Sequence, residues 1–128
     1  MYTNVKFVVV DDDKLIRDFV AEVLMFSVNR EVRSFSNGFS AWDFIEFPDN
    51  ADIVVSDVDM PEMTGFELLT KIKENFPEKK CIMMSGDPGN ETTAKRLGAD
   101  AFLAKPFGMD DLFNIVDTFV VGSETSCN

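Results

Sequence analysis

The sequence predicts an α/β fold in which helices cover both faces of a doubly wound, five-stranded parallel sheet. Five short apolar runs alternate along the 128 residues with segments whose apolar residues recur at helical spacing. Most of these runs are continuously apolar, which is typical of parallel strands buried on both faces. Two of them, residues 5–10 and 53–56, run directly into aspartates. Strictly alternating strands and helices predict one sheet with right-handed crossovers.

The first half of the chain supplies two strands and two helices. Residues 5–10 form the first expected strand, and Asp13 is the candidate N-cap of the helix that follows. Residues 31–35 form a short second strand, and Asn37-Gly38 opens the second helix. The expected apolar face of the first helix comprises Leu15, Ile16, Phe19, Val20, Val23 and Leu24, and that of the second comprises Phe39, Trp42 and Ile45.

The second half supplies three more strands. Residues 53–56 are the third, and the helix after them ends at Pro77, because the residue before a proline disfavours helical geometry. Residues 81–84 and 101–104 are the fourth and fifth strands, separated by a weakly apolar helix over residues 90–97. The apolar residues of the third helix are Phe66, Leu69, Ile72 and Phe76, and those of the last are Met109, Leu112, Phe113, Val116 and Val120. Their spacing predicts that they pack on the sheet.

One domain is expected over residues 1–121, followed by a flexible tail over residues 122–128, which are small and polar. Cys81 lies in an apolar run and Cys127 in the tail, so a disulfide framework is not expected and a reducing compartment is favoured. The N-terminus lacks the pattern of a signal peptide, and no apolar run approaches the roughly 20 residues needed to span a bilayer. We therefore expect a cytoplasmic chain without membrane insertion.

The charge of the chain and its lack of histidine argue against several classes of function. It carries 23 Asp and Glu against 12 Lys and Arg, which repels polyanions and argues against direct nucleic-acid binding. It contains no histidine, which excludes a Ser-His-Asp triad, an HExxH zinc site and a phosphohistidine on this chain. Any histidine chemistry must come from a partner.

The carboxyl ends of four expected strands bring acids together with one lysine. Unit charges about 4 Å apart interact by roughly 4 kcal/mol at an effective dielectric constant of about 20, so several ionised carboxylates in one hollow would repel seriously. A divalent cation resolves this repulsion, and an all-oxygen site favours a hard ion such as Mg²⁺. The converging residues are Asp11, Asp12, Asp13, Asp57, Asp59, Ser85 and Lys105.

Each of these residues also has a purely structural interpretation. Asp13 is most simply a helix cap, Ser85 alone would be an ordinary loop serine, and Lys105 could be a solvated surface lysine. However, Lys105-Pro106 directly after an apolar strand suggests a constrained, cis-prone peptide that aims the lysine side chain. Helix caps do not require three converging acids and a lysine, so Asp11, Asp12 and Asp57 together favour a functional site.

In the order VVVDDD, DIVVSDVDMPEMTGFELL, MMSG and GADAFLAKPF, the chain resembles the receiver domains of two-component response regulators. The resemblance covers essentially the whole sequence and implies the flavodoxin-like receiver fold with strand order 2-1-3-4-5. It implies that Asp57 is the phosphoacceptor and that Asp11 and Asp12 are the acidic pair, with Asp12 the direct Mg²⁺ ligand. The implied roles of the remaining residues are a metal ligand through the backbone carbonyl of Asp59, a switch hydroxyl on Ser85, a phosphate-pairing Lys105 and a switch aromatic at Phe102.

The resemblance also implies a function. Asp57 would take a phosphoryl group from a histidine of a sensor kinase or a histidine phosphotransfer protein, with Mg²⁺ as cofactor. The chain would then change conformation and signal to, or relay phosphate to, a downstream protein. It would catalyse only its own phosphorylation and dephosphorylation. No output domain is recognised within these 128 residues, so we expect a stand-alone receiver unless the sequence is a fragment of a larger regulator.

Three alternative functions fit the sequence less well. Small Mg²⁺-dependent phosphatases use an Asp-x-Asp pair after a strand, and two places in this chain have that spacing, but Leu15 and Pro61 replace the Thr or Val of that family and no cap domain is available. A receiver-like interaction module without phosphorylation would lack a pocket residue, and none is missing. A flavin site would need amides or hydroxyls in the first loop, which is acidic here.

Overall fold

The computed structural model describes residues 5–26 and 31–125, and its sheet has five parallel strands in the order β2-β1-β3-β4-β5. This confirms the expected fold and strand order. The strands are β1 (Lys6–Val10), β2 (Glu31–Phe35), β3 (Ile53–Asp57), β4 (Lys80–Ser85) and β5 (Ala101–Ala104). The helices are α1 (Lys14–Phe26), α2 (Gly38–Ile45), the 3-10 helix η1 (Pro48–Asn50), α3 (Gly65–Asn75), α4 (Asn90–Arg96) and α5 (Met109–Thr125).

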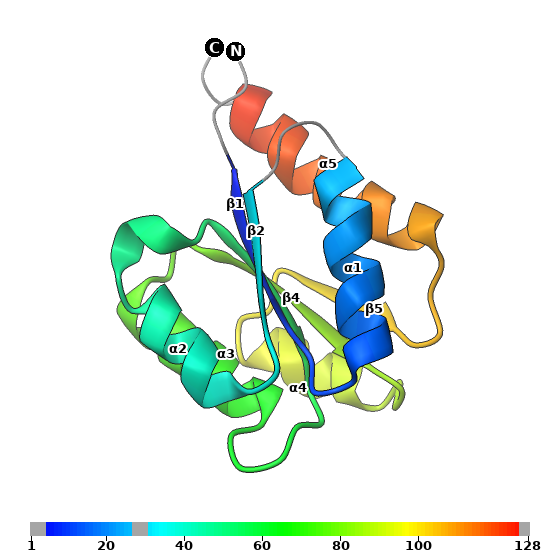
Figure 1. Cartoon of the computed structure of the whole chain (residues 1–128). Coiled ribbons are helices and arrows are strands. Elements are labelled where there is room, and N and C mark those ends of the chain that lie inside the picture. Colours follow the sequence, from blue (N-terminus) through cyan, green and yellow to red (C-terminus); the bar gives the residue numbers. More distant parts are fainter. Residues whose placement is uncertain (1–4, 27–30, 126–128) are drawn as a thin grey trace.

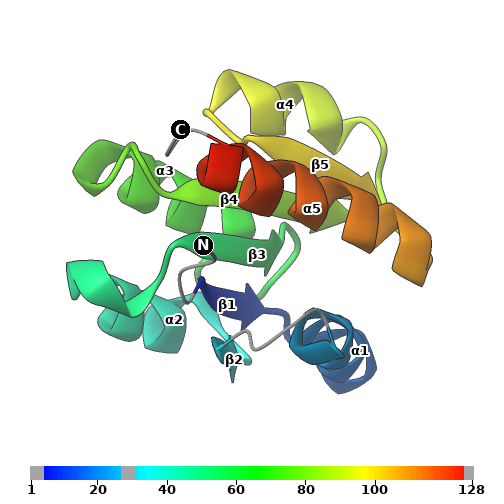
Figure 2. The same ribbon diagram turned by 90° about the horizontal axis from the view of Figure 1, so that it is seen from above.

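The sheet separates two apolar clusters. Helices α1 and α5 lie on one face, and α2 and α3 lie on the other (Figures 1 and 2). The α1/α5 side is filled by side chains such as Phe7, Leu24 and Leu112, each at most 1% exposed. The opposite side is filled from α2, α3 and α4, for example by Ile45 and Leu68. Residues of β1, β3 and β4 enter both clusters alternately, which explains their continuously apolar sequences.

Side-chain caps fix where three helices begin. Oδ1 of Asp13 accepts hydrogen bonds from the backbone amides of Leu15 (2.9 Å) and Ile16 (3.4 Å), which confirms Asp13 as the N-cap of α1. Asn37 caps α2 in the same way through the amide of Ser40. Thr64 and Glu67 form a reciprocal capping box at the start of α3. Each cap sets the length of a loop at the carboxyl edge of the sheet.

Four residues assigned to apolar helix faces are exposed instead. Leu15 is 81% exposed, Phe39 53%, Met109 50% and Phe19 37%. Leu15 and Met109 lie in the first turns of their helices, beyond the ends of the strands that precede them, where the sheet offers no surface to pack against. Their assignment to the core was therefore wrong, because spacing alone does not show where the sheet ends.

The end of the chain also differs in detail from the sequence analysis. Helix α5 continues to Thr125, past the domain boundary placed at residue 121. The rest of the expected tail, residues 126–128, lies outside the described residues. No helix in the described part of the chain combines the length and the apolar character needed to cross a membrane.

Candidate functional site

The carboxyl edge of the sheet collects the expected site residues. Asp57 is the last residue of β3, and Asp11 directly follows β1, its neighbour in the sheet. Ser85 ends β4, and Lys105 directly follows β5, which pairs with β4. The parallel register thus brings together four residues that are widely separated in sequence.

Lys105 joins two buried carboxylates. Its Nζ lies 2.9 Å from Oδ1 of Asp57 and 3.1 Å from Oδ2 of Asp11. The side chains of Asp57 and Asp11 are 6% and 0% exposed, whereas that of Lys105 is 21% exposed. Asp11 is held further by the Asp13 amide, which donates to its Oδ1 at 2.9 Å. The peptide between Lys105 and Pro106 is cis, as the sequence suggested.

Burial and charge together set the protonation of this group. Burial raises the pKa of Asp57 to about 6, and the charge of Asp11 adds to this, although the hydrogen bond from Lys105 acts in the opposite direction. Burial likewise raises the pKa of Asp11, against the hydrogen bond from the Asp13 amide. Burial disfavours the charge of Lys105, but its hydrogen bond to Asp57 and the charge of Asp11 outweigh that effect and raise its pKa. One lysine therefore compensates two acids incompletely.

A third acid completes a set suited to a metal ion. Carboxylate oxygens of Asp11, Asp12 and Asp57 all lie within 4.8 Å of one another, and Asp12 is exposed. This set offers only oxygen atoms, which suits a hard divalent cation such as Mg²⁺. The raised pKa of Asp57 fits as well, because a cation would supply the positive charge that Lys105 alone does not. Asp59 is exposed, two residues beyond Asp57.

The backbone of Asp57 is packed against the start of α3. A Cβ atom added to Gly65 would lie 2.0 Å from the carbonyl oxygen of Asp57 and 2.8 Å from Cα of Val58. The Gly65 amide donates to the Val58 carbonyl at 2.8 Å, and the Val58 amide to that of Met84 at 2.9 Å. Only glycine allows this approach, which fixes the loop after the expected phosphoacceptor.

Ser85 is fully buried, and its hydroxyl is engaged on the side of α4. Oγ of Ser85 accepts hydrogen bonds from the backbone amide of Asp87 at 3.0 Å and from Nδ2 of Asn90 at 2.9 Å. Sequence reasoning did not single out Asn90, because an asparagine at the start of a helix is typical of a cap. Phe102 of β5 is partly buried and packs against the cluster on the α2/α3 face.

A further contact that the sequence did not indicate involves Arg17 of α1. Its Nη1 donates to the backbone carbonyl of Asp11 at 2.8 Å, while the Asp11 amide donates to the carbonyl of Phe35 at 3.1 Å. An arginine six residues after an aspartate carries no motif, so only the folded structure shows that it braces the acidic loop.

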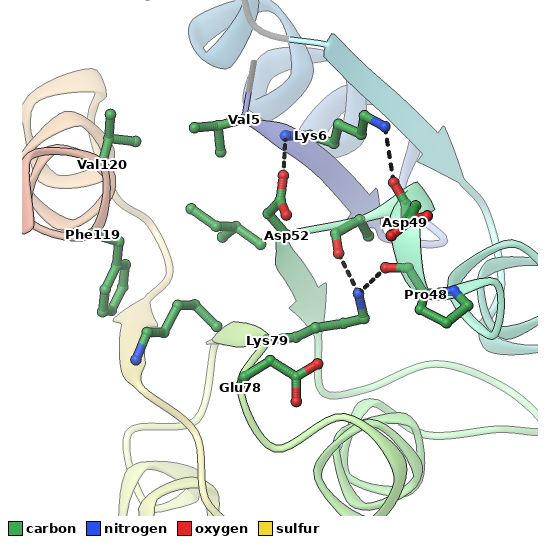
Figure 3. Close-up of a pocket in the computed structure, with 12 residues that line it drawn as sticks. Val5, Lys6, Pro48, Asp49, Asp52, Glu78, Lys79, Phe119 and Val120 are labelled. Atoms are coloured by element: carbon green, nitrogen blue, oxygen red, sulfur yellow. Dashed lines mark hydrogen bonds between the residues drawn. The ribbon is translucent and has the colours of Figure 1, made fainter. Parts of the chain in front are cut away.

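A cavity of about 720 Å³ lies at the opposite, amino end of the strands (Figure 3). The ammonium group of the buried Lys79 donates to the carbonyls of Pro48 and Ala51, both at 2.5 Å, and Nζ of Lys6 donates to the carbonyl of Asp49. These charges hold the segment around η1 against the sheet. All three of these bonds go to backbone carbonyls, so we interpret the arrangement as structural.

Comparison with known proteins agrees with this geometry. Residues 7–117 match the family described as the response regulator receiver domain. The chain is 30% identical over 130 residues to the response regulator Rre1 of Synechocystis, covering 98% of this chain and 56% of that protein. It is 28% identical to a chemotaxis protein CheY homologue of Campylobacter jejuni, covering 80% of this chain and 82% of that protein.

Among solved structures, a CheY-like receiver domain protein from Methanospirillum hungatei superimposes with a TM-score of 0.86 at 28% identity. The superposition covers 97% of this chain and 99% of that one. This chain spans little more than half the length of Rre1, and it spans about a quarter of the NtrC regulators of Azospirillum brasilense and Rhizobium meliloti that it also matches.

Proposed function

The chain belongs to the response regulator receiver domain family and is a signalling domain of the CheY type, and on this premise we propose that Asp57 accepts the phosphoryl group. The observation that carries the proposal is the ion pair between the buried Asp57 and the partly buried Lys105, whose charged atoms lie 2.9 Å apart at the carboxyl edge of the sheet. The small-phosphatase alternative has no support among the comparisons.

Asp57 would act as the nucleophile from the end of β3, the central strand of the sheet, which is buried throughout. One carboxylate oxygen would bond to the phosphorus while the bond to the donor's histidine nitrogen breaks. Lys105, now paired with two carboxylates, would donate to an oxygen of the arriving phosphoryl group. Water would later hydrolyse the acyl phosphate and restore the carboxylate. In this proposal the domain catalyses no reaction except these two on its own side chain.

The metal would be held by the carboxylates of Asp11, Asp12 and Asp57 and by the backbone carbonyl of Asp59. The first three already lie together, and Asp59 is exposed in the loop that follows Asp57. When bound, Mg²⁺ would neutralise negative charge on the phosphoryl oxygens. Asp11, which is fully buried, keeps the acidic loop in place through its bonds to Lys105 and to the Asp13 amide.

The switch would consist of Ser85 and Phe102. A phosphoryl group on Asp57 presents three strong acceptor oxygens, and the Ser85 hydroxyl ends the neighbouring strand. A movement of Ser85 toward them would leave space for the ring of Phe102, which is partly buried and needs no polar partner. The equilibrium between two conformations of the domain would then shift, and the face made by α4, β5 and α5 would change.

The proposed partners are a sensor histidine kinase or a histidine phosphotransfer protein, and a downstream protein, all in the cytoplasm. The chain has no histidine, so the donor histidine must lie outside these 128 residues. Exposed apolar side chains suited to such a partner lie near the site. Leu15 and Phe19 are on α1, and the ring of Phe19 lies 6.3 Å from that of Phe107, which follows β5.

The test is a mass measurement. The protein, incubated with acetyl phosphate and Mg²⁺, should gain the mass of one phosphoryl group, and Asp57→Asn should gain none. Asp59→Asn is the matched control, because it removes an exposed carboxylate two residues away but leaves the backbone carbonyl. An equal gain in Asp57→Asn would place the acceptor elsewhere.

A further inference from the structure

The buried hydroxyl of Ser85 has both of its acceptor positions occupied. A serine hydroxyl offers two lone pairs and one proton. One lone pair takes the Asp87 amide at 3.0 Å, and the other takes Nδ2 of Asn90 at 2.9 Å. Ser85 is 0% exposed, and in the described part of the chain its proton has no acceptor within hydrogen-bond distance. A buried donor without an acceptor is costly, so this proton is available to an incoming anion.

Asn90 is also part of a closed loop. Its own amide donates to the carbonyl of Asp87 at 3.0 Å, and Oδ1 of Asp87 accepts from the Gly89 amide at 2.9 Å. Residues 85–90 are therefore tied together at both ends, and Asn90 is the first residue of α4. The bond from Nδ2 of Asn90 thus connects the Ser85 hydroxyl directly to the start of that helix.

We infer that Asn90 is a positioning residue that tethers α4 to the Ser85 hydroxyl, so that α4 follows Ser85 when an anion occupies Asp57. The inference rests on the proposed function and deepens it. Donation by Ser85 to the anion uses its proton, while the two bonds that it accepts use its lone pairs. All three bonds can exist together, so the tether does not have to break when Ser85 moves.

The probe is beryllofluoride with Mg²⁺, added to the whole chain as a substitute for the phosphoryl group. Binding is measured by titration, and the response of α4 is read from the backbone amide resonances of residues 91–96. In the wild type these resonances should shift on binding. In Asn90→Ala the probe should still bind, but the α4 shifts should fall to less than about half, because the tether is gone. Alanine favours helix more than asparagine does, so α4 itself persists.

Thr92→Ala is the matched control for Asn90→Ala, because Thr92 is an exposed polar residue of the same helix. It should keep the full α4 response. Equal shifts in Asn90→Ala and the wild type would overturn the tether. So would α4 resonances in probe-free Asn90→Ala that already match those of the bound wild type, because Asn90 would then restrain α4 instead of pulling it.

Asn90→Asp tests the direction of the hydrogen bond. The new carboxylate has nearly the same shape but can only accept, so it would take the Ser85 proton away from the anion. Affinity for beryllofluoride should fall roughly tenfold, the range of one charge-assisted hydrogen bond. Thr92→Asp adds the same charge without contacting Ser85 and should lose much less. Equal losses in the two variants would overturn the inference, whereas failure of the wild type itself to bind the probe would overturn the proposed function.

Discussion

Ionising the Asp57 carboxyl costs more free energy in the folded protein than in water. The effect of replacing Asp57 on stability should therefore depend on pH. The pKa rises from 3.8 to about 6 on folding without metal, mainly through burial. A raised pKa contributes stability that is complete below about pH 4, and this stability is lost as the pH rises through about 6. The side chain of Asn does not ionise, so Asp57→Asn does not lose stability in this way as the pH rises.

The measured quantity is the free energy of unfolding of Asp57→Asn minus that of the wild type, in the presence of a metal chelator. This difference should be larger at pH 7.5 than at pH 4 by about 1–3 kcal/mol, in favour of Asp57→Asn. Urea unfolding at the two pH values measures this difference. If the difference in free energy of unfolding between the two proteins were the same at both pH values, ionisation of Asp57 would not destabilise the fold.

Asp12 and Asp13 are both exposed neighbours of Asp11 but have separate roles. Asp12→Ala should abolish Mg²⁺ binding, because it removes the exposed member of the carboxylate set, and it should leave stability nearly unchanged. Asp13→Ala should retain Mg²⁺ binding and lose about 1 kcal/mol of stability, because its Oδ1 caps α1. Calorimetric Mg²⁺ titration and thermal melts of both variants check this. The reverse pattern would contradict the site assignment.

At the scale of single residues, sequence reasoning selected the acids and the lysine because charge directly after an apolar strand is unusual. It did not find Asn90 or Arg17, whose roles depend on side-chain hydrogen bonds across loops. It gave Ser85 the role of a switch hydroxyl that donates to the phosphoryl group, but it did not indicate that both of its described bonds lead toward α4.

Among the elements, the start of α3 constrains the site most directly. Gly65→Ala would place a Cβ atom 2.0 Å from the Asp57 carbonyl oxygen, so the loop or the helix must move. We expect a loss of about 3 kcal/mol, at the upper end for overpacking, and weaker Mg²⁺ binding. Gly86→Ala is the control, because a Cβ atom there would meet nothing within 4 Å. Equal unfolding midpoints for the two variants would contradict the close packing.

The central strands β1, β3 and β4 could be predicted because a parallel strand buried on both faces has a distinctive apolar run. The edge strands β2 and β5 are less buried, and their prediction rested more on the alternation of strands and helices. The pattern did not separate apolar residues that face the sheet from those just beyond its edge. Leu15 and Met109 have the correct spacing, yet both lie past the strand ends and are exposed. The extent of a helix face thus depends on the length of the sheet beneath it, which no single helix encodes.

For the molecule as a whole, the exposed flank of α1 gives the partner proposal a test. Leu15→Ser should slow phosphoryl transfer from a phosphohistidine protein by about tenfold, because a partner that covers Leu15 would lose apolar contact area. Labelling by acetyl phosphate should be unchanged. Met25→Ser, also an exposed apolar residue of α1 but at the other end of the helix, should transfer like the wild type. Equal slowing by both substitutions would contradict a docking surface beside the site.

The ion pair of Lys105 also has a consequence for the order in which the molecule becomes competent. Lys105 reaches Asp57 across 48 positions of the chain and Asp11 across 94. During synthesis, both acids leave the ribosome long before the lysine does, and their pairing must wait until β5 has joined the sheet. A half-made chain thus carries Asp57, the proposed nucleophile, without its cationic neighbour. Under the proposed function, phosphoryl transfer to Asp57 would therefore depend on the docking of β5, the last strand to be synthesised.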